Sequence, residues 1–233
     1  MKKWELIPCA SDLAVANLAA DEWVQQLPSP TAGPYLTAFS GGRIAKHFLA
    51  ATAAKLKGRD YSHLHFFWAD ERCVPPENPD SNFLLAQESL FNSSRIEPNQ
   101  IHRIHGEDDP HVAANKATME IKHLAPASRE GLPVLDMLFL GMGEDGHVAS
   151  LFPGGAPEEP GAIYYPVIAS KPPPNRITMS YGVLAAARAV WVLASGEGKS
   201  DALKRSLHEG SSTPLGRVLQ GRSMTRIFTD VQL

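Results

Sequence analysis

A glycine-rich segment that ends in an acid and an imidazole, residues 141–147 (Gly-Met-Gly-Glu-Asp-Gly-His), follows the apolar run 134–140. Glycine lets backbone N–H groups approach a ligand closely, because it has no Cβ atom. Imidazole is a natural base near neutral pH, and a nearby carboxylate tunes or orients it. Asp145 and His147 are therefore the sharpest candidates for proton transfer, although their spacing does not by itself guarantee a contact.

The same segment also fits the pattern G-x-G-x-x-G that is typical of dinucleotide-binding proteins. That pattern should open a long helix and be followed about 20 residues later by an acid at the end of the next strand. Here Pro153 and Gly154 leave room for only a short helical turn. The acids at the right distance, Glu158 and Glu159, lie in a proline-rich stretch. The sequence therefore argues against a nicotinamide or flavin cofactor.

A second segment, Ser40-Gly41-Gly42-Arg43, joins a predicted strand to a predicted helix. The exposed N–H groups at the start of a helix favour an anion such as phosphate. The two glycines permit close approach, and the guanidinium adds positive charge. The alternative is a tight turn that binds nothing.

Two further segments bring cations to the ends of predicted strands. Arg72 follows Asp70 and Glu71, and it can hold a phosphate through two hydrogen bonds while the acids orient it or face substrate hydroxyls. Lys199 lies near another helix start, in a sequence that ends like a P-loop, but Leu193 stands where a P-loop requires glycine. Hydrolysis of a nucleoside triphosphate is therefore rejected, and a structural ion pair and a solvated lysine remain the alternatives at these two segments.

The elements that must position these residues are strands alternating with helices. Apolar runs predict strands over residues 35–39, 64–69, 101–104, 134–140, 167–169, 189–194 and 225–229. Helical spacing predicts helices from Ser11 to about 27, over 43–56, over 81–91 with Asp80 as the cap, over 110–124, and within 196–207. This alternation predicts an α/β protein with a mainly parallel sheet, in which ligands bind beyond the carboxyl ends of the strands. The four candidate segments fall there.

Composition limits the classes of function. The 233 residues are 43% hydrophobic, which predicts one domain over 1–233. A formal charge of −3 gives no footprint for nucleic acid or an anionic membrane. Without a signal-peptide core or a long apolar run, we expect a cytoplasmic protein. The two cysteines predict reduced thiols, and the histidine pairs 63/65 and 102/105 lack companion ligands, so we expect no metal.

In several segments the chain resembles the 6-phosphogluconolactonase family. The matching segments are 39–42 (FSGG), 68–76 (WADERCVPP), 80–82 (DSN), 140–154 (LGMGEDGHVASLFPG), 173–178 (PPNRIT) and 196–199 (GEGK). They occur in the family's order between about residues 35 and 205. The long segment around His147 is specific, whereas the Gly-Gly turn alone is not.

The resemblance implies a Rossmann-like three-layer α/β/α sandwich, which is shared with glucosamine-6-phosphate deaminases. It implies hydrolysis of the sugar-phosphate lactone 6-phospho-D-glucono-1,5-lactone to 6-phosphogluconate in the pentose phosphate pathway, without a cofactor, by a monomer or small homo-oligomer. By this resemblance His147 is the base that activates water.

The resemblance also implies roles for the surrounding residues. It places Ser40, Gly41 and Gly42 in the phosphate loop, Arg72 and Lys199 as basic anchors, and Asp145 and Arg176 along the site. The residue types and positions themselves add Arg43, Asp70 and Gly143 to the candidates for substrate binding. Backbone N–H groups of the loop 143–146 are candidates to stabilise the oxyanion that forms when water attacks the carbonyl.

Two departures from the family pattern stand out. Arg43 and Ile44 replace a common Ser or Thr, and the final segment 225–233 lacks an expected tryptophan. A deaminase is the nearest alternative, but that family has an acid seven positions after Asp145, where this chain has Phe152. Arg72, in place of an aromatic residue, also favours the lactonase. A sugar-phosphate sensor without turnover is the other alternative.

Overall fold

The computed structural model describes residues 3–128, 130–155 and 158–233. Its centre is a six-stranded sheet in the order β1-β9-β8-β5-β2-β3, formed by β1 (Trp4–Pro8), β2 (Tyr35–Phe39), β3 (Leu64–Trp68), β5 (Met137–Gly141), β8 (Ala189–Ala194) and β9 (Thr225–Thr229). Every neighbouring pair in this sheet is parallel. The prediction of a mainly parallel α/β sheet is therefore confirmed.

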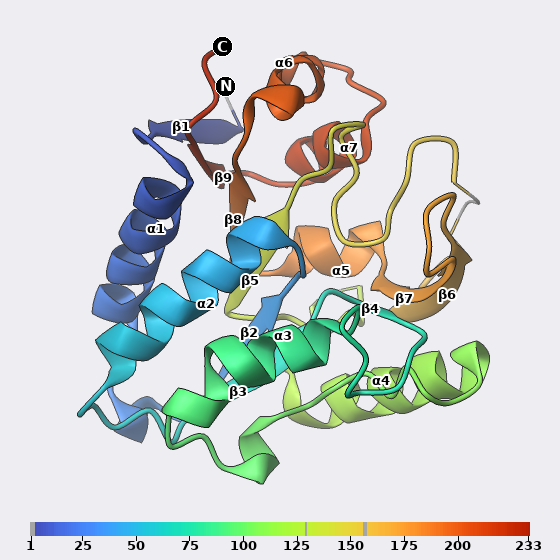
Figure 1. Ribbon diagram of the computed structural model, residues 1–233. Helices are drawn as coiled ribbons and strands as arrows, with labels where there is room; N and C mark the ends of the chain where they lie inside the picture. The colour runs from blue at the N-terminus through green and yellow to red at the C-terminus, as the bar shows by residue number, and fades with distance from the viewer. Residues whose placement is uncertain (1–2, 129, 156–157) are drawn as a thin grey trace.

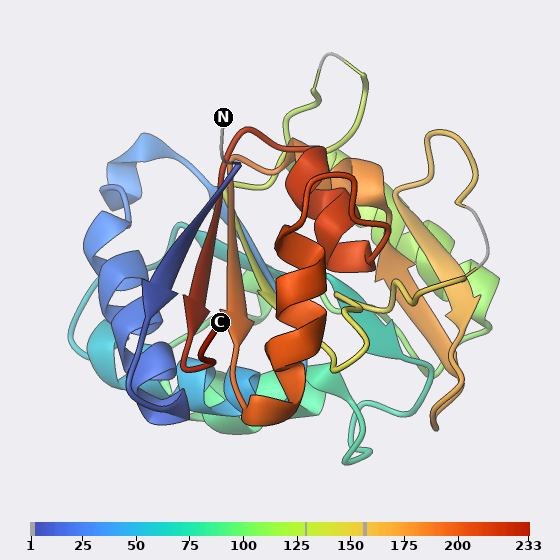
Figure 2. The ribbon, with the colours of Figure 1, turned by 90° about the horizontal axis from the view of Figure 1, so that it is seen from above.

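Helices cover both faces of this sheet and make it the middle layer of three. On one face lie α1 (Asp12–Gln26) and α2 (Arg43–Leu56), with α3 (Asn82–Ser89) beside α2. On the other face lie α5 (Tyr181–Ala186), α6 (Ser200–Leu207) and α7 (Pro214–Gln220). Figure 2 shows the sheet between α1 and α2 on one side and α6 and α7 on the other.

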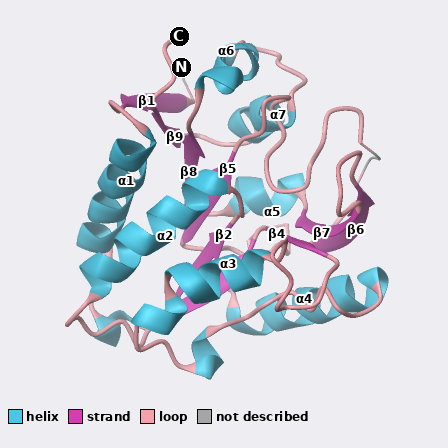
Figure 3. Ribbon diagram, in the orientation of Figure 1, coloured by secondary structure: helices cyan, strands magenta, loops and turns pink. Residues whose placement is uncertain are grey.

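A second, smaller sheet lies beside the main one, as Figure 3 shows. It is antiparallel, in the order β4-β7-β6, and consists of β4 (Asp70–Arg72), β6 (Tyr164–Ile168) and β7 (Asn175–Met179). Helix α4 (Pro110–Leu124) packs against β6 and β7. The sequence predicted a loop at 70–72, because a stretch of three charged residues carries no apolar pattern of a strand.

The core explains why the central strands form where they do. Strand β5 is apolar on both faces, and β3 is apolar apart from His65; such runs suit parallel strands that are covered by helices on both sides. The ring of Phe139 lies 4.4 Å from the ring centroid of Phe48 on α2 and 4.9 Å from that of Trp23 on α1. This aromatic cluster fixes both helices against the sheet and so fixes where α2 begins.

Several predicted boundaries differ from the structure. The cap of α3 is Ser81, whose Oγ accepts a hydrogen bond from the N–H of Leu84, and not Asp80. Residues 101–104 form no strand, since only Ile101 makes an isolated bridge, to Phe66. The strand predicted over 134–140 begins at Met137. The predictions missed β1, β7, α5 and α7, which are short.

Candidate active site

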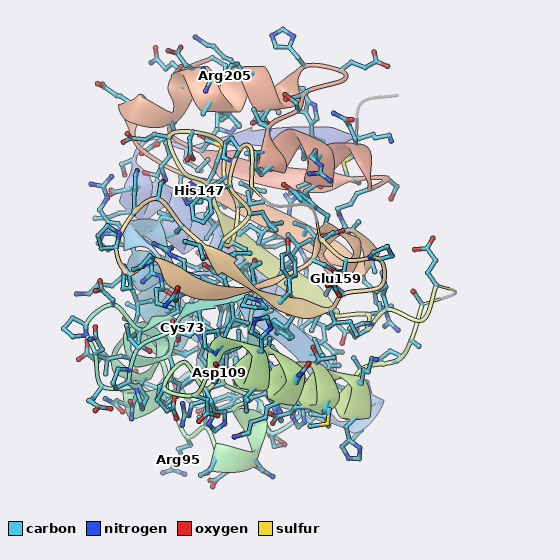
Figure 4. The ribbon with its side chains drawn as sticks, turned by 90° about the vertical axis from the view of Figure 1, so that its right-hand side faces the viewer. Cys73, Arg95, Asp109, His147, Glu159 and Arg205 are labelled. Carbon is cyan, nitrogen blue, oxygen red and sulfur yellow. The ribbon has the colours of Figure 1, made fainter. Side chains whose placement is uncertain are left out.

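The four candidate segments meet at one cavity of about 270 Å³ at the carboxyl ends of β2, β5 and β8. Nine of the predicted site residues line it: Ser40, Gly41, Gly42, Arg43, Asp70, Arg72, His147, Arg176 and Lys199. The rule that ligands of parallel sheets bind beyond the strand ends therefore locates this cavity correctly. Figure 4 shows His147 on the loop that follows β5.

His147 and Asp145 are in direct contact. The Nδ1 atom of His147 lies 2.6 Å from Oδ1 of Asp145, and the backbone N–H of His147 donates to the same oxygen at 3.1 Å. Partial burial acts to raise the pKa of Asp145, but the backbone N–H and the ring of His147 outweigh it, and the pKa is lowered. An ionised carboxylate only accepts hydrogen bonds, so the contact assigns the hydrogen to Nδ1, and in the neutral ring this leaves the lone pair on Nε2.

Gly143 makes room for this pair. A Cβ atom at position 143 would lie 2.1 Å from Nδ1 of His147 and 2.7 Å from Oδ1 of Asp145. The N–H of Gly143 donates to the carbonyl of His147 at 2.9 Å, and the N–H of Gly146 donates to the carbonyl of Gly143 at 3.0 Å. These two N–H groups close the loop on itself, so within the loop 143–146 they are not the ones free to stabilise an oxyanion.

An aromatic ring and a guanidinium flank the imidazole. The ring centroid of Phe152 lies 4.8 Å from that of His147, and the guanidinium carbon of Arg176 lies 5.6 Å from the Phe152 centroid. Position 152 is the one at which a deaminase would carry its acid. Here it gives the imidazole an apolar neighbour that exchanges no proton.

The start of α2 opens on the same cavity. Gly42 is its N-cap with φ of 105°, a left-handed conformation that favours glycine, and no side chain within the described part of the chain caps the helix. The N–H groups of the first turn are therefore available to an anion. The Oγ of Ser40 is buried and has no hydrogen-bond partner among the described residues.

The side chain of Asn82 packs against the backbone of this turn at Gly41. A Cβ atom at Gly41 would lie 1.8 Å from Oδ1 of Asn82, so only glycine fits there. The amide nitrogen of Asn82 donates to the carbonyl of Asp70 at 2.8 Å. The phosphate-loop candidate and the end of the small sheet are thus joined through one buried amide, which the sequence analysis did not predict.

Four cations surround the cavity in two pairs. Arg72 and Arg176 face each other across β4 and β7, and Arg72 Nη1 donates to the carbonyl of Asp80. Arg43 and Lys199 stand at the starts of their helical segments, where burial and the charge of Arg43 lower the pKa of Lys199. Desolvation of a cation is offset when a bound anion supplies the opposite charge. The cavity is therefore suited to an anionic ligand.

Asp70 supplies a carboxylate to the cavity wall. It is only 4% exposed, and its Oδ2 accepts from the hydroxyl of Ser150 at 2.7 Å. Ser150 follows Ala149, which lines the cavity with a φ of 49°, a left-handed conformation unusual for a residue other than glycine. Asp70 thereby ties the small sheet to the loop that carries His147.

The prediction of site residues had two kinds of gap. Asp145 and Gly143 were predicted to lie along the site, but they do not line the cavity and instead hold His147. The cavity also has lining residues that were not predicted individually: Asp12, Ile44, Gly141, Met142, Ala149 and Ser195. All but Asp12 lie within the candidate segments or within two residues of them, so the strand-end rule locates their neighbourhood.

A histidine cluster lies away from this cavity. Nδ1 of His65 is 2.9 Å from Nε2 of His102, whose Nδ1 is 2.7 Å from Oε1 of Glu120. Among the described residues, no group of three or more His, Cys, Asp or Glu side chains is arranged to hold a metal ion. In the same residues, no helix is long and apolar enough to cross a membrane.

The fold and cavity define an α/β protein that combines an anion-binding helix start with a carboxylate-oriented imidazole. The sequence pattern of the family described as glucosamine-6-phosphate isomerases/6-phosphogluconolactonase matches residues 11–227. The chain belongs to this family.

Individual relatives agree with this assignment. A rice protein named probable 6-phosphogluconolactonase 3, chloroplastic, is 33% identical over an alignment of 211 residues, and the match covers 85% of this chain and 64% of the rice protein. A Streptomyces coelicolor 6-phosphogluconolactonase is 35% identical over an alignment of 178 residues, and the match covers 72% of this chain and 68% of that protein. The chain thus spans slightly less than two thirds of its rice relative.

A solved structure shows the same fold. The 6-phosphogluconolactonase from Trypanosoma cruzi superposes with a TM-score of 0.84 at 24% identity, covering 98% of this chain and 95% of that chain. At this level of identity the likeness establishes the architecture, and the chemistry must be argued from the cavity.

Proposed function

We propose that this chain hydrolyses 6-phospho-D-glucono-1,5-lactone to 6-phosphogluconate, with His147 as the base that activates water. One observation carries the proposal. The ring of His147, held through Nδ1 by Asp145 at 2.6 Å, lines the same small cavity as the uncapped start of α2 and four cations. A base beside an anion site is what a lactone with a remote phosphate requires. The names of the relatives support this choice of substrate.

In the proposed reaction, Nε2 of His147 accepts a proton from water while the water oxygen bonds to the lactone carbonyl carbon. The Asp145 carboxylate accepts from Nδ1–H and stabilises the imidazolium that forms. The tetrahedral intermediate then expels the ring oxygen, which takes the proton back from Nε2. The resulting carboxylic acid ionises and releases one proton to solvent. Water is the only co-reactant.

The developing oxyanion needs a donor other than the N–H groups of Gly143 and Gly146, which are already bonded. Arg72 and Arg176, which line the cavity, are the candidates that we favour. A fixed cation aimed at developing charge lowers a barrier more than it strengthens substrate binding.

The phosphate is proposed to lie at the start of α2, against Ser40, Gly42 and Lys199. The free N–H groups of the first turn and the unpartnered hydroxyl of Ser40 supply donors, and Lys199 supplies charge. Arg43, which stands in place of a family hydroxyl, adds a second cation from the same turn. Binding at this remote group orients the carbonyl toward His147.

Two alternatives are weaker. An amino-sugar-phosphate deaminase would share the fold and the cavity, but Phe152 places a ring against His147 where that family carries an acid. A sensor without turnover would have no need of an imidazole bonded to a carboxylate at the cavity wall.

The test is proton release from freshly generated lactone above the spontaneous background. We expect fast hydrolysis by the wild type and a loss of about 10²- to 10⁴-fold in kcat for His147→Ala, with binding of 6-phosphogluconate retained. The exposed His208 supplies the matched control, His208→Ala, which should hydrolyse at the wild-type rate.

A second pair of variants tests the phosphate site. Lys199→Ala should raise KM for the phosphorylated lactone and leave D-glucono-1,5-lactone unaffected, whereas Lys204→Ala, an exposed change on α6, should alter neither. Ammonia release from glucosamine 6-phosphate would favour the deaminase, and binding without faster hydrolysis would favour the sensor.

We also propose that the chain acts in the cytoplasm as a monomer or small homo-oligomer. Size-exclusion chromatography with light scattering would test the oligomeric state.

A further inference from the structure

The last residues of the chain lie against the loop that carries Lys199. Ala194 at the end of β8 pairs with Thr229 at the end of β9, so the next residues, Ser195 and Asp230, continue side by side. The carboxylate of Asp230 accepts from the hydroxyl of Ser195 at 2.8 Å through Oδ2 and from the N–H of Gly196 at 3.0 Å through Oδ1.

A second contact lies beyond Lys199 in the chain. The hydroxyl of Ser200 donates to the carbonyl of Gln232 at 3.1 Å. The terminal segment 230–232 therefore holds the loop on both sides of Lys199, at 195–196 and at 200. Gly196 has a φ of 106°, so the turn held by Asp230 is a left-handed one that this chain builds with glycine.

The contact reaches Lys199 through the backbone. The carbonyl of Gly196, whose N–H is bonded to Asp230, accepts from the N–H of Lys199 at 3.0 Å. Asp230 itself does not line the cavity, whereas Ser195 and Lys199 do. Its carboxylate is thus a support behind the cavity wall and not a group that meets the ligand.

Charge acts in the same direction as geometry. Burial and the nearby guanidinium of Arg43 disfavour the charged form of Lys199, and they lower its pKa. The carboxylates of Glu144 and Asp230 act in the opposite sense and favour the ammonium. Asp230 therefore helps to keep positive charge where an anion would bind.

We infer that Asp230 is a positioning residue that sets the Lys199 ammonium for a phosphate-bearing ligand. The inference rests on the proposed function only in taking Lys199 as a phosphate anchor. It makes the end of the chain, which lies outside every segment that resembles the family, part of the binding apparatus.

The test is a double-mutant cycle in the binding of inorganic phosphate, measured by isothermal titration calorimetry. We expect Asp230→Asn to weaken phosphate binding about 3- to 30-fold in the wild-type background and less than about twofold in the Lys199→Ala background. The exposed Asp201, two residues past Lys199, supplies the control: Asp201→Asn removes a similar charge without touching Ser195 or Gly196 and should change binding less than about twofold.

Asp230→Asn keeps an oxygen that can accept from the N–H of Gly196, so the variant should fold. A midpoint of urea unfolding equal to that of the wild type would show this. Equal losses of phosphate binding in both backgrounds would mean that Asp230 supports the fold only, and no loss in either would remove its role. If the wild type binds no phosphate, Lys199 is not an anchor and the inference fails.

A failure of the lactonase proposal can be distinguished from a failure of this inference, because the two are read in different measurements. In that case the wild type releases no proton from the lactone, and the phosphate cycle still gives its own answer. If the lactone is hydrolysed, Asp230→Asn should raise KM for the phosphorylated lactone, leave kcat unchanged and leave the unphosphorylated lactone unaffected. An equal fall in kcat for both lactones would contradict a positioning role.

Discussion

At the scale of single residues, the reactive pair of this site depends on a residue that has no reactive side chain. His147 and Asp145 were predicted from the sequence because their types are reactive and they follow a strand. Their contact was not predictable, since a spacing of two residues in a loop is compatible with many geometries. Gly143 decides it, because the absence of its Cβ lets the imidazole and carboxylate lie against its backbone.

Replacing Gly143 with alanine should therefore misplace the base. The new Cβ would lie 2.1 Å from Nδ1 of His147, so the ring must move by more than an ångström to reach ordinary contact. We expect kcat to fall by about 10²-fold while 6-phosphogluconate still binds, because a shift of about 1 Å costs this much in an oriented reaction.

Steady-state kinetics of Gly143→Ala beside Gly221→Ala would check this prediction. Gly221 has a φ of −73° and lies at the end of α7, away from the cavity. The remote variant should keep its activity. Full activity in Gly143→Ala would show that the His147 and Asp145 pair is not needed in the observed arrangement.

Lys199 allows a prediction about pH. Burial and Arg43 lower its pKa from the ordinary value of 10.5, and a lowered pKa means that a lysine loses its charge earlier as pH rises. Binding of 6-phosphogluconate should thus weaken on the alkaline side at pH values where an ordinary lysine is still charged. Lys199→Arg should postpone the loss, since a guanidinium stays charged.

Calorimetric titrations between pH 7 and pH 10 would measure this effect, with Lys204→Arg on the exposed face of α6 as the control. Parallel curves for the wild type and Lys199→Arg would mean that another group limits alkaline binding.

At the scale of elements, apolar runs predicted the strands that form the centre of the sheet, and helical spacing predicted α1, α2 and α4 closely. The small antiparallel sheet was not predicted. Its strand β4 is Asp-Glu-Arg, and its partner β7 (Asn175–Met179) follows far along the chain, so nothing local marks the pairing. Asp230 and Asn82 were missed for the same reason, because each acts on a segment distant in sequence.

Glu71 shows how β4 is tied to α3. Its Oε1 accepts from the N–H groups of Arg72 and Asn82 at 2.7 Å each, and its Oε2 accepts from the N–H of Phe83 at 2.8 Å. Burial raises its pKa to about 7, although these backbone donors act to lower it. Above that pH, the ionised carboxylate accepts hydrogen bonds from the first N–H groups of α3. These groups need an outside acceptor because the first N–H groups of a helix have no partner within it.

Because burial raises the pKa of Glu71 in the folded state, its ionisation costs stability as the pH rises through about 7, and the wild type should lose free energy of unfolding between pH 5 and pH 8. We expect Glu71→Gln, which cannot ionise, to lose less over this range, because its amide keeps an oxygen for the N–H groups of α3 without a buried charge. Urea unfolding would measure the change. The exposed Glu88 on α3 supplies Glu88→Gln as the control, expected within about 0.5 kcal/mol of the wild type. The same loss of stability between pH 5 and pH 8 in Glu71→Gln would show that Glu71 is not the group that titrates.

At the scale of the whole molecule, the order of the strands makes the two ends of the chain depend on each other. The last strand, β9, lies between the first strand, β1, and β8. The cavity therefore draws on the whole chain: α2 follows the second strand, His147 follows β5, and Lys199 is held by the segment after β9. Local patterns predicted β9 but not its place in the sheet, because its partners are chosen by packing on both faces.

This arrangement predicts that the chain unfolds as one unit, in keeping with the single domain expected over 1–233. Phe228 of β9 is fully buried and packs on Trp191 of β8 with 4.9 Å between ring centroids. Phe228→Ala should cost about 3–5 kcal/mol, as the loss of a large buried ring does, and should shift the urea midpoints of far-UV circular dichroism and of lactone hydrolysis together. Met224→Ala, an exposed change beside β9, should leave both midpoints in place. If activity survived past a first transition in circular dichroism, the β1 and β9 edge would be an independent unit, and the support of Lys199 by the chain end could not be essential for catalysis.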